Sequence, residues 1–400
     1  MSNCFGKKYI FMTLFFITFF LLYGGMHLYA FLKVRNAFNP GTNASAILIL
    51  FMFTMLFAPF IVRLSEKNGF DVSARIMSYI GYTWMGMILL FFASSIALDF
   101  FRVIVHTAEL ITKKNFYYLK PAAGFSVSAA FLLAALISIY GYFEAGNIRT
   151  ERLIIKTPKL SEQTGNLRIV QISDIHIGLI VREGRVKKIL KEVKTANPDI
   201  LVSTGDFVDG QINNLTGLSE FFREINPRYG KFAVTGNHEF YAGLSQALDF
   251  TREAGFTILR GQGISIDGLI NIAGIDDPAG RNYSLIKGVS EKELLLQFPG
   301  KNFTLLLKHR PVVDKNSIGF FDLQLSGHSH KGQIFPFSLI TKFYYAANAG
   351  YSNLTNNSHL YVSRGAGTWG PPIRFLAPPE ITVIDIVHDN GGKIEDGTKA

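Results

Sequence analysis

Five short clusters in the second half of the chain carry side chains of the kinds that bind metal ions. Their candidate ligands are Asp174, His176, Asp206, Asn237, His309, His328 and His330. These residues offer imidazole, carboxylate and amide oxygen ligands, a set that suits Mn, Fe or Zn. A structural zinc site built on cysteine is disfavoured, since the clusters hold no thiolate and the only cysteine is Cys4. The residue types therefore predict a metal centre built from nitrogen and oxygen ligands.

The spacing inside two clusters adds to this prediction. Asp174 and His176 form an Asp-x-His string, and His328 and His330 form a His-x-His string. Because residues two apart in an extended chain point to the same face, each pair could serve one ion or be shared between two. Glycines at 205, 236 and 327 permit the tight turns and close backbone approach that such a site requires.

Every cluster comes where a short apolar run, typical of a β-strand, gives way to a loop. These runs cover residues 167–172, 200–203, 232–235, 303–308 and 323–326. Stretches 187–196 and 245–254 are typical of helices between them. Because the carboxyl ends of neighbouring strands share one rim of a sheet, the clusters can converge there. The pattern predicts an α/β layered domain with a mixed sheet.

The five clusters also resemble a known family. Their order is Asp-x-His, Gly-Asp-x-x-Asp, Gly-Asn-His-Glu, a lone His and Gly-His-x-His, which resembles the calcineurin-like metallophosphoesterase superfamily over residues 167–386. The tail from Ser363 to Glu380, with Thr368-Trp369-Gly370-Pro371-Pro372, resembles the membrane-associated bacterial branch of YkuE-like and YaeI-like phosphodiesterases. The resemblance implies a layered α/β/β/α sandwich.

Carried over residue by residue, the resemblance implies a centre with two divalent or mixed-valence ions of Mn, Fe or Zn. The ligands form two sets of three with one bridging residue: Asp174, His176 and His330; Asn237, His309 and His328; and Asp206 between them. His238 would lie beside the metals, where it would stabilise or protonate the leaving oxygen.

Two cations about 3.5 to 4 Å apart can share a hydroxide, lower its pKa and hold phosphoryl oxygens for in-line attack. The expected function is a membrane-bound phosphoesterase that uses this metal-bridging hydroxide on a phosphoric ester. A phosphodiester or pyrophosphate of a lipid or nucleotide-lipid is favoured over a monoester. The alternative is a catalytically inactive metal-binding scaffold or a regulatory module at the membrane.

Several acidic residues near the clusters have more than one reading. Asp209 and Glu239 could orient ligands or simply satisfy the backbone of their loops. Asp276 and Asp277 belong to an Asp-Asp-Pro turn, for which a structural role is expected.

The first part of the chain has the composition of a membrane region. Residues 9–32, 44–62, 76–98 and 121–143 contain no Lys, Arg, Asp or Glu, and each stretch is about long enough to cross a bilayer as a helix. A signal peptide is an alternative for the first stretch, but its apolar run is longer than a signal requires and three more follow. We expect a four-helix anchor over residues 1–146, a linker over 147–165, a catalytic domain over 166–390 and a tail over 391–400.

The distribution of charge bears on location and partners. Residues 1–160 carry 15 Lys and Arg against 6 Asp and Glu, whereas the rest carries 25 against 24, so a nucleic-acid partner is not expected. The expected partners are a lipid bilayer and a phosphorylated small-molecule or lipid substrate. Nine basic residues against six favour a cytoplasmic catalytic domain at a bacterial plasma membrane. The oligomeric state is not predicted.

Overall fold

The computed structural model describes residues 13–389 except 15, 211–214, 216, 267, 284, 286, 287 and 299. Contacts within the chain define two units, Met1–Tyr142 with Gly370–Ile373, and Phe143–Trp369 with Arg374–Ala400. The tail predicted over 391–400 lies outside the described residues.

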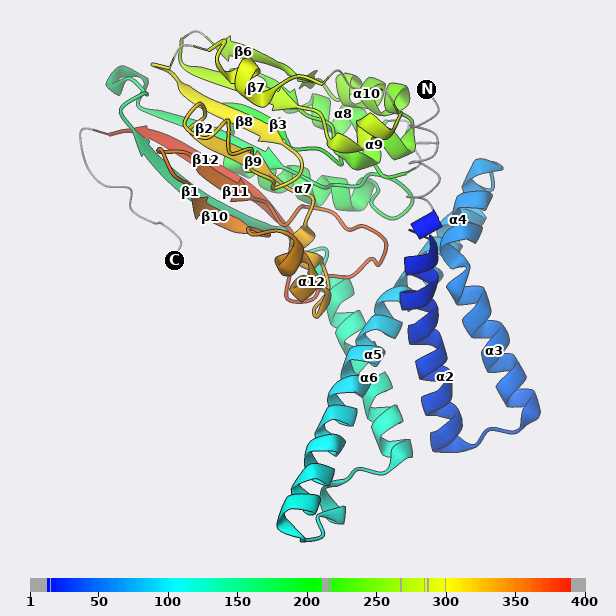
Figure 1. Ribbon diagram of the computed structural model, residues 1–400. Coiled ribbons are helices and arrows are strands. Elements are labelled where there is room, and N and C mark those ends of the chain that lie inside the picture. Colours follow the sequence, from blue (N-terminus) through cyan, green and yellow to red (C-terminus); the bar gives the residue numbers. More distant parts are fainter. Residues whose placement is uncertain are drawn as a thin grey trace. The chain divides into compact units, whose positions relative to one another are not determined.

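The first unit is helical. Its α-helices are α2 (Gly25–Phe38), α3 (Thr42–Leu56), α4 (Ala58–Lys67), α5 (Asp71–Thr112) and α6 (Ala123–Glu144), the last of which continues into the second unit. Large apolar side chains are exposed all along these helices, as they are in segments that face lipid. Figure 1 shows α2, α3, α5 and α6 as long helices within this unit.

Several of these helices are long and apolar enough to cross a membrane. They cover Phe16–Phe38, Asp71–Thr112 and Tyr117–Glu144. The pair α3 and α4, bent by 53°, gives a fourth candidate if it counts as one span. Pro59 at the start of α4 accounts for the break, because its ring removes a backbone donor from the helix. The structure thus contains three candidate spans, or four with the bent pair, at the places where the sequence predicts four.

The second unit contains two six-stranded mixed sheets (Figure 1). The first sheet has the order β1 (Arg149–Thr157), β12 (Glu380–His388), β2 (Asn166–Ile172), β3 (Ile200–Ser203), β4 (Lys231–Ala233) and β5 (Thr257–Ile258). The second has the order β10 (Gly350–Asn353), β11 (His359–Val362), β9 (Leu323–Ser326), β8 (Phe303–Lys308), β7 (Ile270–Ile275) and β6 (Gln262–Ile266). The strands β2 to β5 run parallel, and so do β7, β8, β9 and β11.

The two sheets are covered by helices on their outer faces. The helices of this unit are α7 (Glu183–Ala196), α8 (Leu218–Arg223), α9 (Asn237–Ala242), α10 (Leu244–Glu253), α11 (Glu291–Leu295) and α12 (Phe337–Tyr344). On β2, Leu167 and Ile169 pack between the sheets, whereas Val170 and Ile172 pack against the helical layer. On the far side, Leu294 of α11 packs against the second sheet. This confirms the predicted α/β/β/α sandwich.

The predicted linker over 147–165 is corrected in part. Residues 149–157 of this segment form β1, which pairs in parallel with β12. Leu153 and Ile155 of β1 are buried in the layer between the sheets, while Ile154 between them is 43% exposed. This alternation was hidden in a polar segment because the strand lies at the edge of its sheet and only one face is apolar.

Candidate metal centre

The backbone turns sharply where the strands end at the predicted ligands. Asp174, His176, Asp206, His328 and His330 all have positive φ, between 48° and 69°. Residues other than glycine rarely adopt a positive φ, and those that do are concentrated at functional sites. The expectation that Asp-x-His and His-x-His are extended is therefore wrong at these positions. Left-handed turns orient these side chains instead, and the backbone N–H groups of Asp174 and His176 donate to the carbonyls of Gly205 at 3.0 Å and Asp206 at 3.1 Å.

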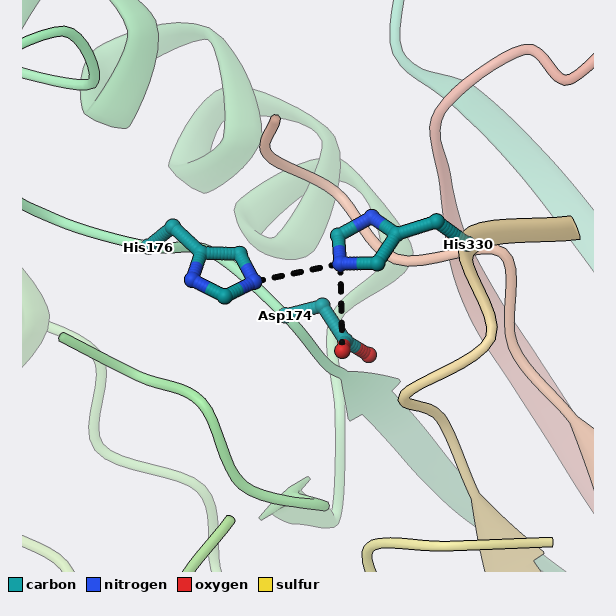
Figure 2. A group of neighbouring side chains, drawn as sticks. All are labelled: Asp174, His176 and His330. Carbon is teal, nitrogen blue, oxygen red and sulfur yellow. Dashed lines mark hydrogen bonds and ion pairs between the residues drawn. The ribbon is translucent and has the colours of Figure 1, made fainter. Parts of the chain in front are cut away.

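Asp174, His176 and His330 form the first cluster, and all three side chains are buried (Figure 2). The Nε2 atoms of His176 and His330 are 3.1 Å apart, and His330 Nε2 is 3.4 Å from Asp174 Oδ1. One ligand atom from each residue lies within 4.8 Å of the others. Two ring nitrogens and a carboxylate oxygen that converge in this way are arranged to share one cation.

Asp206, His309 and His328 form the second cluster. His328 Nδ1 lies 3.1 Å from His309 Nε2, which is itself 3.1 Å from Asp206 Oδ2. The same Oδ2 atom is 3.8 Å from His176 Nε2 in the first cluster. Asp206 thus lies between the clusters, as expected of a bridging ligand. The pair His328 and His330 is divided between the clusters, whereas Asp174 and His176 stay together.

Asn237 provides an independent test of whether a cation fits here. Its Oδ1 atom is buried and has no hydrogen-bond partner among the described residues. An unsatisfied buried acceptor costs about 1 to 3 kcal/mol, a cost that a coordinated cation removes. The adjoining backbone N–H of His238 donates to Asp206 Oδ1 over 2.8 Å, which places this turn beside the second cluster. The donor set therefore fits metal ions.

The protonation states of Asp206 and the neighbouring histidines depend strongly on one another. Burial opposes the ionisation of Asp206, yet the imidazoles of His309 and His238 hold the pKa of its carboxyl well below the usual range. Burial lowers the pKa of the His309 ring, but Asp206 outweighs it and raises that pKa to about 10. Burial and the charge of His309 lower the pKa of His328 to about 2. Positive charge is thus drawn to the position between Asp206 and the histidines, where a metal ion would supply it.

Comparison with known proteins identifies the family to which this centre belongs. The model of the calcineurin-like phosphoesterase family matches residues 167–332. A metallophosphoesterase of Aquifex aeolicus is 40% identical over 255 residues, which are 64% of this chain and 97% of the relative. The chain belongs to the calcineurin-like metallophosphoesterase family. It is a metal-dependent phosphoric ester hydrolase by family.

Two further relatives match this metallophosphoesterase. The metallophosphoesterase YkuE of Bacillus subtilis is 32% identical over 262 residues, which cover 62% of this chain and 89% of YkuE. A transmembrane protein with metallophosphoesterase domain from Danio rerio is 27% identical over 330 residues, which cover 78% of this chain and 74% of the relative. The resemblance inferred from the motifs is confirmed, and membrane association is a named feature of one relative.

Glu239 holds the turn that carries Asp206, the predicted bridging ligand of this metallophosphoesterase. Its carboxylate accepts backbone N–H groups of Asp206 at 3.1 Å, Phe207 at 2.8 Å and Gly236 at 2.6 Å. Burial, together with the charge of Asp206, raises the pKa of Glu239 to about 7. Of the two roles open from the sequence, the structure supports the first, because Glu239 organises the turn from which Asp206 points.

His238 lies beside the ligands and is oriented by Asp209. The His238 Nδ1 atom is 3.0 Å from Asp209 Oδ1, and its ring meets the His176 ring edge to face at 4.6 Å between centroids. His238 also falls within 4.8 Å of His176 and Asp206, so distance alone would admit it as a ligand. The contact with Asp209 engages Nδ1 and leaves Nε2 available, so the role of His238 at the leaving group stays a prediction.

Two partners fix the orientation of ligand histidines. His309 Nδ1 donates to the Thr204 carbonyl at 2.8 Å, which directs its Nε2 atom toward Asp206. Arg374 Nη2 lies 3.1 Å from His330 Nδ1, and the fully buried Arg374 also donates to the carbonyl of Gly367 at 2.6 Å. Sequence reasoning missed Arg374. A charged residue inside the apolar stretch 373–377 was the available signal.

The Asp-Asp-Pro turn has the structural contacts expected of it. Arg260 pairs with Asp276 at 2.9 Å, and Arg310 pairs with Asp277 at 2.7 Å. Arg310 directly follows the ligand His309, so its pairing with Asp277 also fastens the end of β8.

Proposed function

We propose that this protein is a membrane-bound two-metal hydrolase that cleaves a phosphodiester or pyrophosphate of a lipid or nucleotide-lipid. One observation carries the two-metal part of the proposal. Asp206 Oδ2 is 3.1 Å from His309 in one cluster and 3.8 Å from His176 in the other, so one carboxylate can serve two ions. We propose Mn, Fe or Zn as the ions, because the donor set is imidazole, carboxylate and amide oxygen.

When bound, two such cations lower the pKa of a shared water and neutralise phosphoryl oxygens. The seven ligands fix the position at which the phosphoryl group reacts, so that little reorganisation accompanies the reaction. His238 stands beside that position with Nδ1 engaged by Asp209. Its other ring nitrogen is then available to donate a proton to the leaving oxygen, a contribution of roughly a hundredfold or more.

The lipid part of the proposal depends on the membrane-length helices. Only residues 145–148 separate the end of α6 from the start of β1. A connection this short spans at most about 18 Å, so the first strand starts near the end of a candidate span. Phosphoric esters of lipids are therefore the phosphate compounds nearest to the catalytic domain. We place the catalytic domain on the cytoplasmic side of a bacterial plasma membrane, because nine basic residues against six favour that side.

The proposal is tested with the full chain purified in detergent and supplied with Mn²⁺. Hydrolysis of an aryl phosphodiester and of the matching aryl monoester is followed in parallel, together with phosphate-containing products released from a bacterial lipid extract. We expect turnover of the diester to exceed that of the monoester, and a new product from the extract. Turnover of soluble esters without any lipid product would overturn the lipid assignment. Metal binding without turnover on any of the three would favour an inactive scaffold.

A further inference from the structure

The helix α12 is amphipathic, but its apolar side is exposed and its polar side faces the protein, the reverse of an ordinary surface helix. No side chain of α12 is buried, and five large apolar ones are exposed: Phe337 at 42%, Leu339 at 59%, Ile340 at 59%, Phe343 at 94% and Tyr344 at 73%. A surface helix of a soluble domain normally turns its apolar stripe toward the core. Figure 1 shows α12 beyond the ends of the strands of its own unit, apart from helices α8 to α10.

The polar side of α12 is the side that faces the protein. Ser338 and Thr341 are its less exposed residues, together with the chain around them. The Thr341 hydroxyl donates to the Ser338 carbonyl at 3.0 Å and accepts from Asn348 Nδ2 at 3.3 Å. The bond from Asn348 thus joins the polar side of α12 to the chain outside the helix, and the apolar residues lie on the outer side.

The exposed apolar surface continues beyond α12. Phe335 is 40% exposed, and its backbone N–H donates to the Phe375 carbonyl at 3.1 Å. The next residue, Leu376, is 59% exposed. Trp369 is 54% exposed, and its ring lies 6.1 Å from the His238 ring between centroids. We call Phe335, Leu376, Trp369 and the exposed apolar residues of α12 the apolar rim. Exposed apolar side chains on neighbouring segments, such as these, are typical of an interaction site.

The charge around the apolar rim indicates what covers it. Residues 323–379 contain no Asp or Glu, although they include Lys331 and Lys342. The headgroups of a bacterial inner leaflet are anionic and attract basic segments. A helix with aromatic and aliphatic residues on one side and no acidic residue fits the interface between headgroups and acyl chains, at a depth of about 5 to 10 Å. The same chain carries the membrane-length helices, and four residues separate the end of α6 from the start of β1.

We propose that α12 and the rest of the apolar rim enter the headgroup layer of the bilayer, so that the metal centre opens directly onto lipid headgroups. The centre is coupled to α12 at both ends. His330 begins the turn that leads into α12, and Tyr345, just after it, meets the His328 ring edge to face at 5.7 Å. Contact with lipid stands independently of catalysis. Its consequence, that the substrate is a lipid whose phosphoryl group lies at headgroup depth, rests on the proposed function.

Contact with lipid is measured by fluorescence quenching in the full chain. Because Cys4 is the only cysteine, a Cys4→Ser background allows one label at a time. An environment-sensitive fluorophore is placed at Phe343→Cys on α12 and, as a matched control, at Arg252→Cys on the exposed side of α10. Both proteins are reconstituted in nanodiscs of phosphatidylethanolamine and phosphatidylglycerol, with and without nitroxide-labelled lipid.

We expect the emission of the label at 343 to shift to the blue and to be quenched by lipid that carries nitroxide near its headgroup. We expect the label at 252 to show neither the shift nor the quenching. Equal responses at both positions would overturn the proposal. Protection of position 343 from both nitroxide lipid and a water-soluble quencher would also overturn it, because another protein surface would then cover the helix.

The functional consequence is measured separately with Phe343→Asp. We expect the rate of lipid product formation to fall about tenfold relative to the rate of hydrolysis of the soluble diester in the same preparation. The reason is that the interface no longer buries this aromatic side chain. If this ratio is unchanged while the label at Phe343→Cys is quenched by nitroxide lipid, the substrate part is overturned and the lipid contact remains. If the wild-type protein turns over none of the esters, the proposed function is refuted and the quenching result is unaffected.

Discussion

At the scale of residues, the candidate ligands could be selected from the sequence, whereas the contacts that orient them could not. Residue types and spacing selected Asp174, Asp206 and the histidines, and the structure brings these side chains together in neighbouring clusters. Their binding of metal ions stays a prediction. The positive φ angles of five ligands could not be predicted, since they depend on how each strand end meets its neighbours. Arg374 was missed for a related reason, because its partners are mostly backbone carbonyls brought in from other segments.

Glu239→Gln tests the support beneath the bridging ligand. The amide offers one acceptor instead of two and presents a donor to backbone N–H groups that need acceptors. We expect Mn²⁺ affinity to fall by about 10- to 100-fold, as is typical when a partner of a ligand is removed. Glu224→Gln on an exposed side chain is the control, with Mn²⁺ binding followed by calorimetry. Equal affinities of the two variants would show that Glu239 does not position Asp206.

At the scale of elements, the five strand runs named from the sequence correspond to β2, β3, β4, β8 and β9, whereas the edge strand β1 lies in the predicted linker. The strands β2, β3, β8 and β9 are almost wholly buried because sheet and helices cover both of their faces. The strand β1 has only one buried face and carries Arg149, Arg152 and Lys156, so its composition indicated a linker. Which of the two sheets each strand joins could not be derived, because register and order depend on contacts far apart in the chain.

Leu153→Ala tests whether β1 is an integral strand. Leu153 is 4% exposed between the sheets, and removing its buried methyl groups leaves a cavity. We expect the free energy of unfolding to fall by about 2 to 5 kcal/mol. Ile154→Ala, on the 43% exposed face of the same strand, should cost far less. Urea unfolding of the full chain in detergent measures both variants. Similar losses in the two would indicate that β1 does not pack as described.

Lys231→Met tests how two helices are terminated at the first sheet. The buried Lys231 ammonium donates to the carbonyls of Phe222 at 2.9 Å and Ala254 at 2.8 Å, which lie at the carboxyl ends of α8 and α10. Methionine fills similar space but leaves both carbonyls without this donor, so we expect a loss of about 1 to 3 kcal/mol. Lys194→Met on an exposed ion pair is the control and should change stability little. Stability equal to that of the wild type in Lys231→Met would contradict this role.

At the scale of the whole molecule, the number of spans decides where the catalytic domain faces. Four spans place both ends of the chain on the same side, whereas three would result if the bent pair α3 and α4 enters and leaves by one face. Reporter fusions distinguish these topologies in bacterial cells, with a fluorescent protein that matures in the cytoplasm and a phosphatase active outside it. We expect both ends to score as cytoplasmic. Ends on opposite sides would identify α3 and α4 as a re-entrant segment.

The central claim is that the clusters sharing Asp206 form a two-metal hydrolytic centre. Its most direct test is Mn²⁺-dependent hydrolysis of an aryl phosphodiester by the full chain, compared with Asp206→Asn and His238→Ala. The account predicts turnover that requires metal, that is abolished with loss of bound Mn²⁺ in Asp206→Asn, and that falls at least a hundredfold with Mn²⁺ retained in His238→Ala. Turnover that persists without metal, or that survives in Asp206→Asn, would contradict it.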